Sequence, residues 1–117
     1  MEGDWARPVV HFEIEALDAE RQRAFYRDLF NWDIGDGFIM TIPPGIGGPE
    51  PGPAGHLRQS DRSNVSLFIQ VRDLRSSLAK AAELGGSVLA EPFDVPDGPT
   101  LAAIADPEGN SVMLVQQ

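Results

Sequence analysis

Two histidines and two glutamates are the side chains of this sequence with the clearest capacity for chemistry. The stretch VVHFEIEA contains His11, Glu13 and Glu15 at every second position. Apolar side chains fill the positions between them: Val10, Phe12 and Ile14. This period of two is typical of a half-buried strand, so the imidazole and both carboxylates should share one face. Such a face suits a binding site, because imidazole and carboxylate bind metals and exchange protons, but it also suits a strand exposed to water.

A second stretch, NVSLFIQV, repeats the alternation with different chemistry. Ser66, Phe68 and Gln70 share one face of the predicted strand. We expect that face to offer a hydroxyl, an aromatic ring and an amide to a ligand. In this register, six apolar side chains should pack under helices: Val10, Phe12, Ile14, Val65, Leu67 and Ile69.

Each of these strands precedes a predicted helix. Asp18 opens DAERQRAFYRDLF and Asp73 opens DLRSSLAKAAELGG, and aspartate is a favoured N-cap residue. Phe25, Leu29 and Trp32 recur at helical spacing, which predicts a buried stripe on the first helix. The second helix should end at Gly85 and Gly86.

The two halves of the chain follow one plan, with strand and helix recurring 55 residues apart. This indicates an internal duplication. Further strands are predicted at NWDIGDG, FIMTIPP and AGHLRQ in the first half, and at SVLAEPFDV, TLAAIAD and SVMLVQQ in the second. Residues 43–55 contain ten prolines and glycines in thirteen positions and should form a loop, which is either a lid or a plain surface excursion.

These elements predict an α+β fold with two tandem βαβββ modules, residues 8–59 and 64–117, within one domain spanning residues 1–117. The modules should form a curved mixed sheet around a cleft, with the helices on the outer face. The alternative is a ferredoxin-like domain, which lacks the duplicated fourth strand.

Composition excludes several classes of function. The net charge of −9 argues against nucleic acid and against acidic membranes, because binding to phosphates needs cations. The absence of cysteine excludes disulfides and thiolate chemistry. No apolar run long enough for a membrane helix and no signal peptide are visible, so a cytoplasmic protein is expected.

Three stretches together resemble the vicinal oxygen chelate superfamily, which contains glyoxalase I, bleomycin-resistance proteins and extradiol dioxygenases. They are VVHFEIEALDAERQRAFYRDLFNW, VRDLRSSLAKAAELGG and IADPEGNSVMLVQ. The short bacterial glyoxalase-like proteins of this superfamily look most similar. The resemblance implies four cleft-facing metal ligands, at positions held here by His11, His56, Ser66 and Met113.

Two of those four positions depart from the family pattern, in which Ser66 is usually histidine and Met113 usually glutamate. A hydroxyl and a thioether are poor ligands for a divalent ion of the zinc type. Glu13 is an alternative third ligand, a general base, or an ionised carboxylate paired with an arginine. We therefore expect no cofactor, with a divalent metal at His11 and His56 as the alternative.

The resulting expectation is a protein that binds a small organic molecule in the cleft without a catalytic metal. The predicted ligand-binding residues are His11, Glu13, His56, Ser66, Phe68, Gln70 and Met113, with Glu13 as the catalytic candidate. A metal-dependent lyase or dioxygenase using His11 and His56 is the alternative, and an interaction module with a vestigial cleft is a third. Open sheet edges favour a homodimer.

Overall fold

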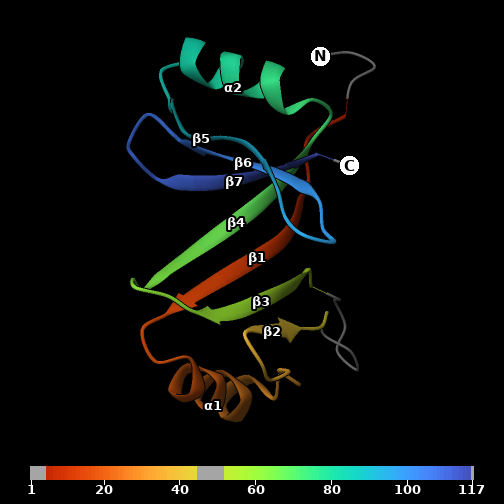
Figure 1. Cartoon of the computed structure of the whole chain (residues 1–117), viewed down its shortest axis with the longest axis vertical. Helices are drawn as coiled ribbons and strands as arrows, with labels where there is room; N and C mark the ends of the chain where they lie inside the picture. Colours follow the sequence, from red (N-terminus) through yellow and green to blue (C-terminus); the bar gives the residue numbers. More distant parts are fainter. Residues whose placement is uncertain (1–4, 45–51, 117) are drawn as a thin grey trace. The chain divides into compact units, whose positions relative to one another are not determined.

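The computed structural model describes residues 5–44 and 52–116. It divides into two compact units. We call Val10–Ser66 the N-terminal unit, and Leu67–Gln117 together with Met1–Val9 the C-terminal unit. The described residues form a mixed α+β structure with two helices and seven strands (Figure 1).

The N-terminal unit contains β1 (Val9–Ala16), α1 (Ala19–Phe30), β2 (Ile39–Ile42) and β3 (Ala54–Gln59). Its strands lie in the order β2-β3-β1, with β1 and β3 parallel and β2 antiparallel to β3. Seven buried side chains form its core: Ile14, Ala16, Ala19, Ile34, Met40, Ile42 and Leu57. Phe12 and Tyr26 pack against this core, so the apolar face of β1 lies toward α1 as predicted.

Helix α1 begins and ends where the sequence predicts, but its buried face differs. The Asp18 carboxylate accepts a hydrogen bond from the Arg21 N–H, and Asn31 ends the helix in the left-handed region at φ 58°. Phe25 and Leu29 are 54% and 59% exposed, so their predicted burial is wrong. Tyr26 takes their place and stacks on Trp32.

The predicted strand NWDIGDG is absent, since residues 31–36 form no strand. Local backbone preferences account for this, because Asn31 and Gly37 both have positive φ. The Gly35 N–H nevertheless donates to the Thr41 carbonyl at 2.9 Å, and the Arg23 guanidinium donates to the Ile34 carbonyl. The segment is therefore fixed beside β2 without joining the sheet.

The predicted loop 43–55 ends two residues earlier than the composition indicates. Strand β3 begins at Ala54, so the last two loop positions belong to the sheet. Residues 45–51, which would form a lid, lie outside the described residues.

The remaining elements are β4 (Asn64–Val71), α2 (Leu74–Glu83), β5 (Ser87–Asp94), β6 (Thr100–Ala105) and β7 (Ser111–Gln116). Their strands lie in the order β4-β7-β6-β5, with β4 and β7 parallel (Figure 1). This is the predicted βαβββ arrangement. Five buried residues form the core under α2: Val71, Leu74, Leu78, Ala102 and Leu114.

The apolar register of β4 is only partly as predicted. Ile69 packs against the core of α2, but Val65 and Leu67 are 60% and 46% exposed. The core under α2 contains Ile69 and Val71 from the C-terminal part of β4. Val65 and Leu67 lie in the N-terminal part of this strand, outside that core. The predicted packing of Val65 and Leu67 under a helix is therefore wrong. Val10 is half-buried and lies outside the core cluster.

The duplication is visible in a recurring hydrogen bond at the start of each helix. The Gln59 side-chain oxygen accepts from the Ala19 N–H at 2.9 Å, and the Gln116 side-chain oxygen accepts from the Leu74 N–H at 2.8 Å. The two glutamines end β3 and β7 and stand 57 residues apart, the same spacing as His56 and Met113. Neither described helix has the length and apolar character needed to cross a membrane.

Candidate functional site

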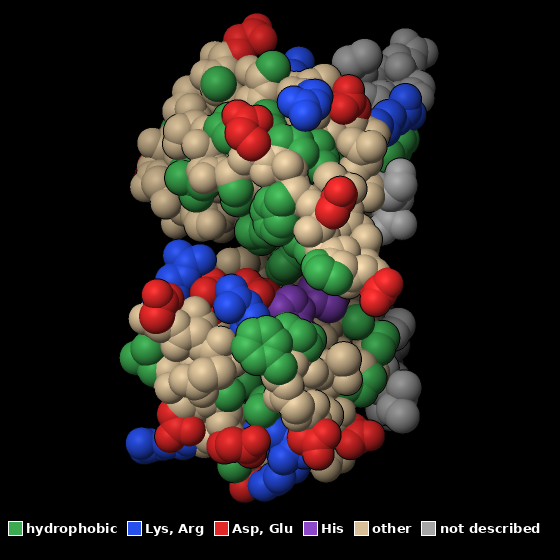
Figure 2. Space-filling model, in the orientation of Figure 1, with side chains coloured by type: hydrophobic (Ala, Val, Ile, Leu, Met, Phe, Trp, Pro, Cys, Tyr) green, Lys and Arg blue, Asp and Glu red, His purple; other side chains and the backbone are tan. Residues whose placement is uncertain are grey.

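The polar residues of β1 and β3 meet on the face of the N-terminal unit opposite α1. Parallel pairing sets Glu13 beside His56 and Glu15 beside Arg58. Because alternate side chains of a strand share a face, His11 lies on this same side. Figure 2 shows the two histidines next to each other, with arginine and acidic side chains beside them. We call this surface the polar face.

Four side chains of the polar face form a continuous chain of contacts. His11 Nε2 lies 2.8 Å from His56 Nδ1. His56 Nε2 lies 2.8 Å from Glu13 Oε2, and Arg58 Nε donates to the same oxygen at 2.6 Å. A carboxylate only accepts hydrogen bonds, so His56 carries a proton on Nε2. We call these residues, His11, His56, Glu13 and Arg58, the His–Glu–Arg chain.

Glu15 anchors a second cluster next to this chain. Its side chain is 3% exposed. Hydrogen bonds reach it from Arg58 Nη2 at 3.2 Å, Ser60 Oγ at 2.9 Å and Arg62 Nη2 at 2.8 Å. Asn64 Nδ2 donates to it at 3.3 Å and to Ser66 Oγ at 2.9 Å. No buried side-chain nitrogen or oxygen in the described part of the chain lacks a partner.

These contacts keep both carboxylates ionised. Burial alone would raise the pKa of Glu13, but hydrogen bonds from His56 and Arg58 outweigh it and the pKa falls below its usual range. Hydrogen bonds from Arg62, followed by Ser60 and Asn64, lower the pKa of Glu15 to about 2. Burial lowers the pKa of His11, and the neighbouring His56 adds to this effect.

The structure divides the predicted ligand-binding residues into two groups. His11, Glu13, His56 and Ser66 belong to the N-terminal unit, where Ser66 is 2% exposed. In the C-terminal unit Phe68 pairs with Met113, and Gln70 lies two residues further along β4. Phe68, Gln70 and Met113 lie on the face of β4 and β7 opposite the core of α2. That both groups line one surface stays a prediction.

The donor atoms on the polar face do not fit a resident divalent ion. His11 and His56 supply two imidazole nitrogens, whereas catalytic zinc sites usually have three protein ligands. Glu13 is hydrogen-bonded to Arg58 and His56, and the Ser66 hydroxyl is bonded to Asn64. Among the residues that the structure describes, no group of three histidine, aspartate or glutamate side chains is placed to hold a metal.

Sequence reasoning missed the arginines that organise this face. Arg58 follows His56 by two positions in AGHLRQ, so strand alternation alone places both on one side. Ser60, Arg62 and Asn64 lie in or next to the β3–β4 connection, where no periodicity predicts their direction.

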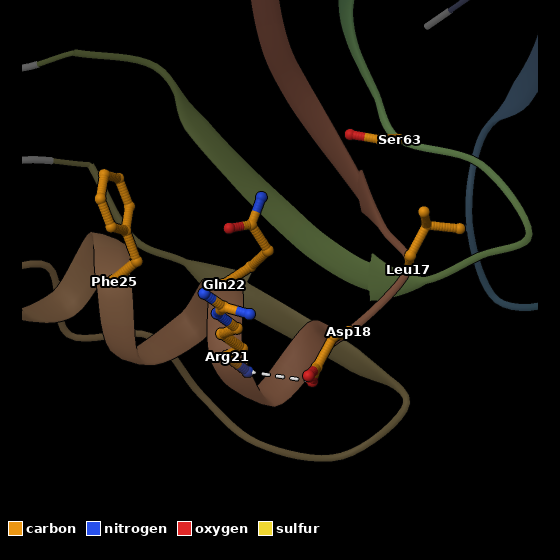
Figure 3. Close-up of a pocket in the computed structure, with 6 residues that line it drawn as sticks. All are labelled: Leu17, Asp18, Arg21, Gln22, Phe25 and Ser63. Atoms are coloured by element: carbon orange, nitrogen blue, oxygen red, sulfur yellow. Dashed lines mark hydrogen bonds between the residues drawn. The ribbon is translucent and has the colours of Figure 1, made fainter.

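A separate groove of about 360 Å³ lies near the start of α1 (Figure 3). Arg21, Gln22 and Phe25 come from the helix, and Ser63 faces them from the turn before β4. Leu17 and Asp18 complete the lining, and Asp18 is already engaged as the helix cap. None of the predicted site residues borders this groove.

Comparison with known proteins identifies the family. The family model for the glyoxalase-like domain matches residues 11–115. The chain belongs to this family. A glyoxylase-like domain-containing protein of Didymella fabae is 29% identical over 109 residues, which cover 85% of each chain.

Solved structures share the fold at lower sequence identity. A glyoxalase/bleomycin resistance protein/dioxygenase superfamily member from Vibrio splendidus is 14% identical, with a TM-score of 0.66 over 96% of this chain and 100% of that one. A Streptomyces coelicolor methylmalonyl-CoA epimerase in complex with 2-nitronate-propionyl-CoA is 18% identical, with a TM-score of 0.60 over 94% of each chain. The resemblance predicted from the sequence is therefore confirmed for family and fold.

Proposed function

We propose that this glyoxalase-like protein binds a small organic molecule on the polar face of its N-terminal unit, without a bound metal. The observation that carries the proposal is the His–Glu–Arg chain. Its two imidazoles and one carboxylate are aligned by Arg58, whose Nε lies 2.6 Å from Glu13 Oε2. An arginine thus supplies the positive charge that an ion supplies in a metal centre.

The chain of contacts favours a ligand with an oxygen that forms hydrogen bonds. The side chains of His56 and Glu13 are 15% and 11% exposed, so they are partly removed from water. Hydrogen bonds are stronger in such surroundings than in bulk water. Both ring nitrogens of His56 are already in contact, Nδ1 with His11 and Nε2 with Glu13, so a carbonyl, carboxylate or hydroxyl oxygen of a ligand would replace one of these contacts. The related epimerase fold holds an acyl-CoA analogue, which supports small-molecule binding by this architecture.

Glu13 is better suited to hold His56 than to act as a free base. Its lowered pKa and its hydrogen bond with Arg58 match the last of the three interpretations from the sequence, an ionised carboxylate paired with an arginine. A catalytic base near neutral pH needs a raised carboxyl pKa. The catalytic role of Glu13 therefore stays a prediction that the electrostatics do not favour.

A screen in the presence of EDTA tests the proposal. Small carbonyl compounds, carboxylic acids and phenols are added to the wild type, to His56→Ala and to the control Glu20→Gln, and melting temperatures are measured. Compounds should stabilise the wild type and the control, and His56→Ala should bind them about tenfold more weakly. A library that stabilises none of these proteins, or stabilises His56→Ala equally, contradicts the proposal.

The second candidate is a divalent-metal-dependent lyase or dioxygenase using His11 and His56. One observation favours it: the two imidazoles are adjacent, with His11 Nε2 and His56 Nδ1 hydrogen-bonded at 2.8 Å, a contact that an ion would have to replace. In that case the ion would take both imidazoles and polarise the substrate oxygens. Elemental analysis of untagged protein that finds about one ion per chain, lost in His11→Ala, would favour this alternative over the metal-free site.

We also propose that the protein forms a homodimer. Strand β2 is one end of the order β2-β3-β1 and β5 is one end of the order β4-β7-β6-β5, and such edges are usually covered. Large apolar side chains of the N-terminal unit are exposed as well, including Phe25, Leu29 and Phe38. A cytoplasmic location stays a prediction.

A further inference from the structure

We propose that the outer end of the Arg58 guanidinium binds the ligand of the polar face, and that this ligand is an uncharged carbonyl compound. The inference rests on the small-molecule binding proposed above and names the chemical class of the ligand. Three features of the N-terminal unit support it: the remaining donors of Arg58, their exposure to water and the balance of charge around them.

Arg58 has hydrogen-bond donors left after it has bound both glutamates. A guanidinium carries five N–H donors in a rigid, planar fork. Arg58 Nε donates to Glu13 Oε2 at 2.6 Å, and Nη2 donates to Glu15 Oε2 at 3.2 Å. These two bonds fix the orientation of the group. Within the described ranges, Nη1 makes no hydrogen bond to another residue.

The Nη1 atom of Arg58 is also open to water. Every fully buried side-chain nitrogen or oxygen in the described part of the chain has a partner, so Nη1, which has none there, is not fully buried. The Arg58 side chain is 31% exposed. A ligand oxygen can therefore bind to Nη1 without breaking a contact. His56 differs, because both of its ring nitrogens are already engaged.

The donors of Arg58 select a ligand atom that accepts hydrogen bonds. A guanidinium has no acceptor, so its partner must offer lone pairs, as a carbonyl oxygen does. The guanidinium and the His56 ring both contact Glu13 Oε2, so the two groups are neighbours. A carbonyl compound bound at Nη1 therefore belongs to the same site as the two histidines.

Charge favours a carbonyl oxygen over a carboxylate at this position. The lowered pKa values of Glu13 and Glu15 keep both side chains ionised. Arg58 and Arg62 balance these two charges, and Asp61 adds a negative charge near Arg62. These five side chains carry no excess of positive charge, and the whole chain has a net charge of −9. A ligand carboxylate would therefore be repelled more than it is attracted.

The experiment compares probes of matched shape that differ in charge. Acetophenone and benzamide are compared with benzoate, and butanone with butyrate, by nuclear magnetic resonance titration at pH 7 in EDTA. The uncharged probes should bind wild type about tenfold more tightly than their carboxylates. Added salt should strengthen benzoate binding and leave acetophenone binding unchanged, because salt screens the repulsion between charges.

Four variants test the role of Arg58, with circular dichroism as the check on folding. Arg58→Gln and Arg58→Lys should each weaken acetophenone binding about tenfold, since neither residue can span both glutamates and still offer a donor. Arg62→Gln is the matched control, because it removes the same charge and leaves Arg58 Nη1 in place. Its acetophenone binding should stay within about twofold of wild type. Glu15→Gln removes a negative charge and should shift the preference toward benzoate.

Three results would overturn the inference. They are benzoate binding as tight as acetophenone binding, acetophenone binding that is unchanged in the folded Arg58 variants, and an equal loss in Arg62→Gln. Arg58→Lys keeps the charge and guards against a misfolded glutamine variant. A wild type that binds only the carboxylates also contradicts the inference but leaves the proposed small-molecule binding standing. A wild type that binds neither kind of probe overturns the inference, and the wider screen in EDTA then decides the proposed function separately.

Discussion

Glu13 and Glu15 occupy equivalent positions on one strand face, yet their surroundings give them different roles. Glu13 accepts from one imidazole and one guanidinium and so orients the histidines. Glu15 accepts from two arginines, a serine and an asparagine, and holds the connection between β3 and β4. One carboxylate serves the candidate site and the other supports the residues around it.

Replacement of Glu15 should weaken the N-terminal unit. Glu15→Gln leaves the Arg58 and Arg62 guanidinium groups without their shared carboxylate, and we expect the free energy of unfolding to fall by about 2 kcal/mol. Urea denaturation at pH 7 measures this. Glu20→Gln, on the exposed side of α1, should change stability by less than about 0.5 kcal/mol. Equal effects of the two substitutions would contradict the structural role of Glu15.

Acidic pH should remove the stabilisation that the ionised Glu15 side chain provides. The pKa of Glu15 is about 2 in the folded protein, against 4.5 ordinarily, so the unfolded chain binds more protons as the pH falls. The stabilisation is complete above the unfolded pKa and is lost as the pH drops from about 4.5 toward 2. The stability difference between wild type and Glu15→Gln should therefore shrink between pH 5 and about 2.5. A difference that stays constant over this range would show that Glu15 is not the titrating group.

At the scale of elements, a glycine sets the distance between β1 and β3. Gly55 pairs with Phe12, and a side-chain carbon there would lie 2.6 Å from the Phe12 ring. Gly55→Ala should cost about 1–3 kcal/mol, because the ring must shift within the core. Gly52→Ala meets nothing within 4 Å and serves as the control. Equal stability of both variants in urea denaturation would contradict this packing.

The glutamines at the ends of β3 and β7 should stabilise the helices that they cap. Gln59→Ala leaves the Ala19 N–H without its acceptor, and Gln116→Ala does the same for Leu74. Each change should lower the free energy of unfolding by about 1 kcal/mol. Gln22→Ala, on the groove side of α1, should change it by less than about 0.5 kcal/mol. If only one of the two cap variants is destabilised, the structural equivalence of the two halves is in doubt.

Sequence reasoning succeeded where the period of side chains decides the outcome and failed where packing decides it. The alternation in β1 correctly placed His11 and Glu13 opposite the core, and both helix-capping aspartates were correct. Phe25 and Leu29 follow helical spacing but are exposed, and Tyr26 packs against the core instead. Arg58 could have been placed from alternation, whereas its pairing partners depend on the strand register, which the sequence did not reveal.

At the scale of the whole molecule, the dimer proposal has a direct test. Apolar side chains more than half exposed are present in both units, for example Leu29 and Leu84. Patches of this kind often mark contacts between proteins. Light scattering at working concentration should give twice the mass of one 12.7 kDa chain. A monomer mass that persists as the concentration rises would contradict the dimer.

The ring signals of the two histidines test the central claim most directly. The chain contains only His11 and His56, so a nitrogen–proton spectrum of imidazole rings reports on the candidate site alone. A compound that stabilises the protein in EDTA is titrated into labelled protein while both rings are observed. The account predicts that both signals shift with the same apparent Kd and without added metal. Binding that leaves both rings unchanged, or that occurs only after a divalent ion is added, would contradict a metal-free site built on His11, His56 and Glu13.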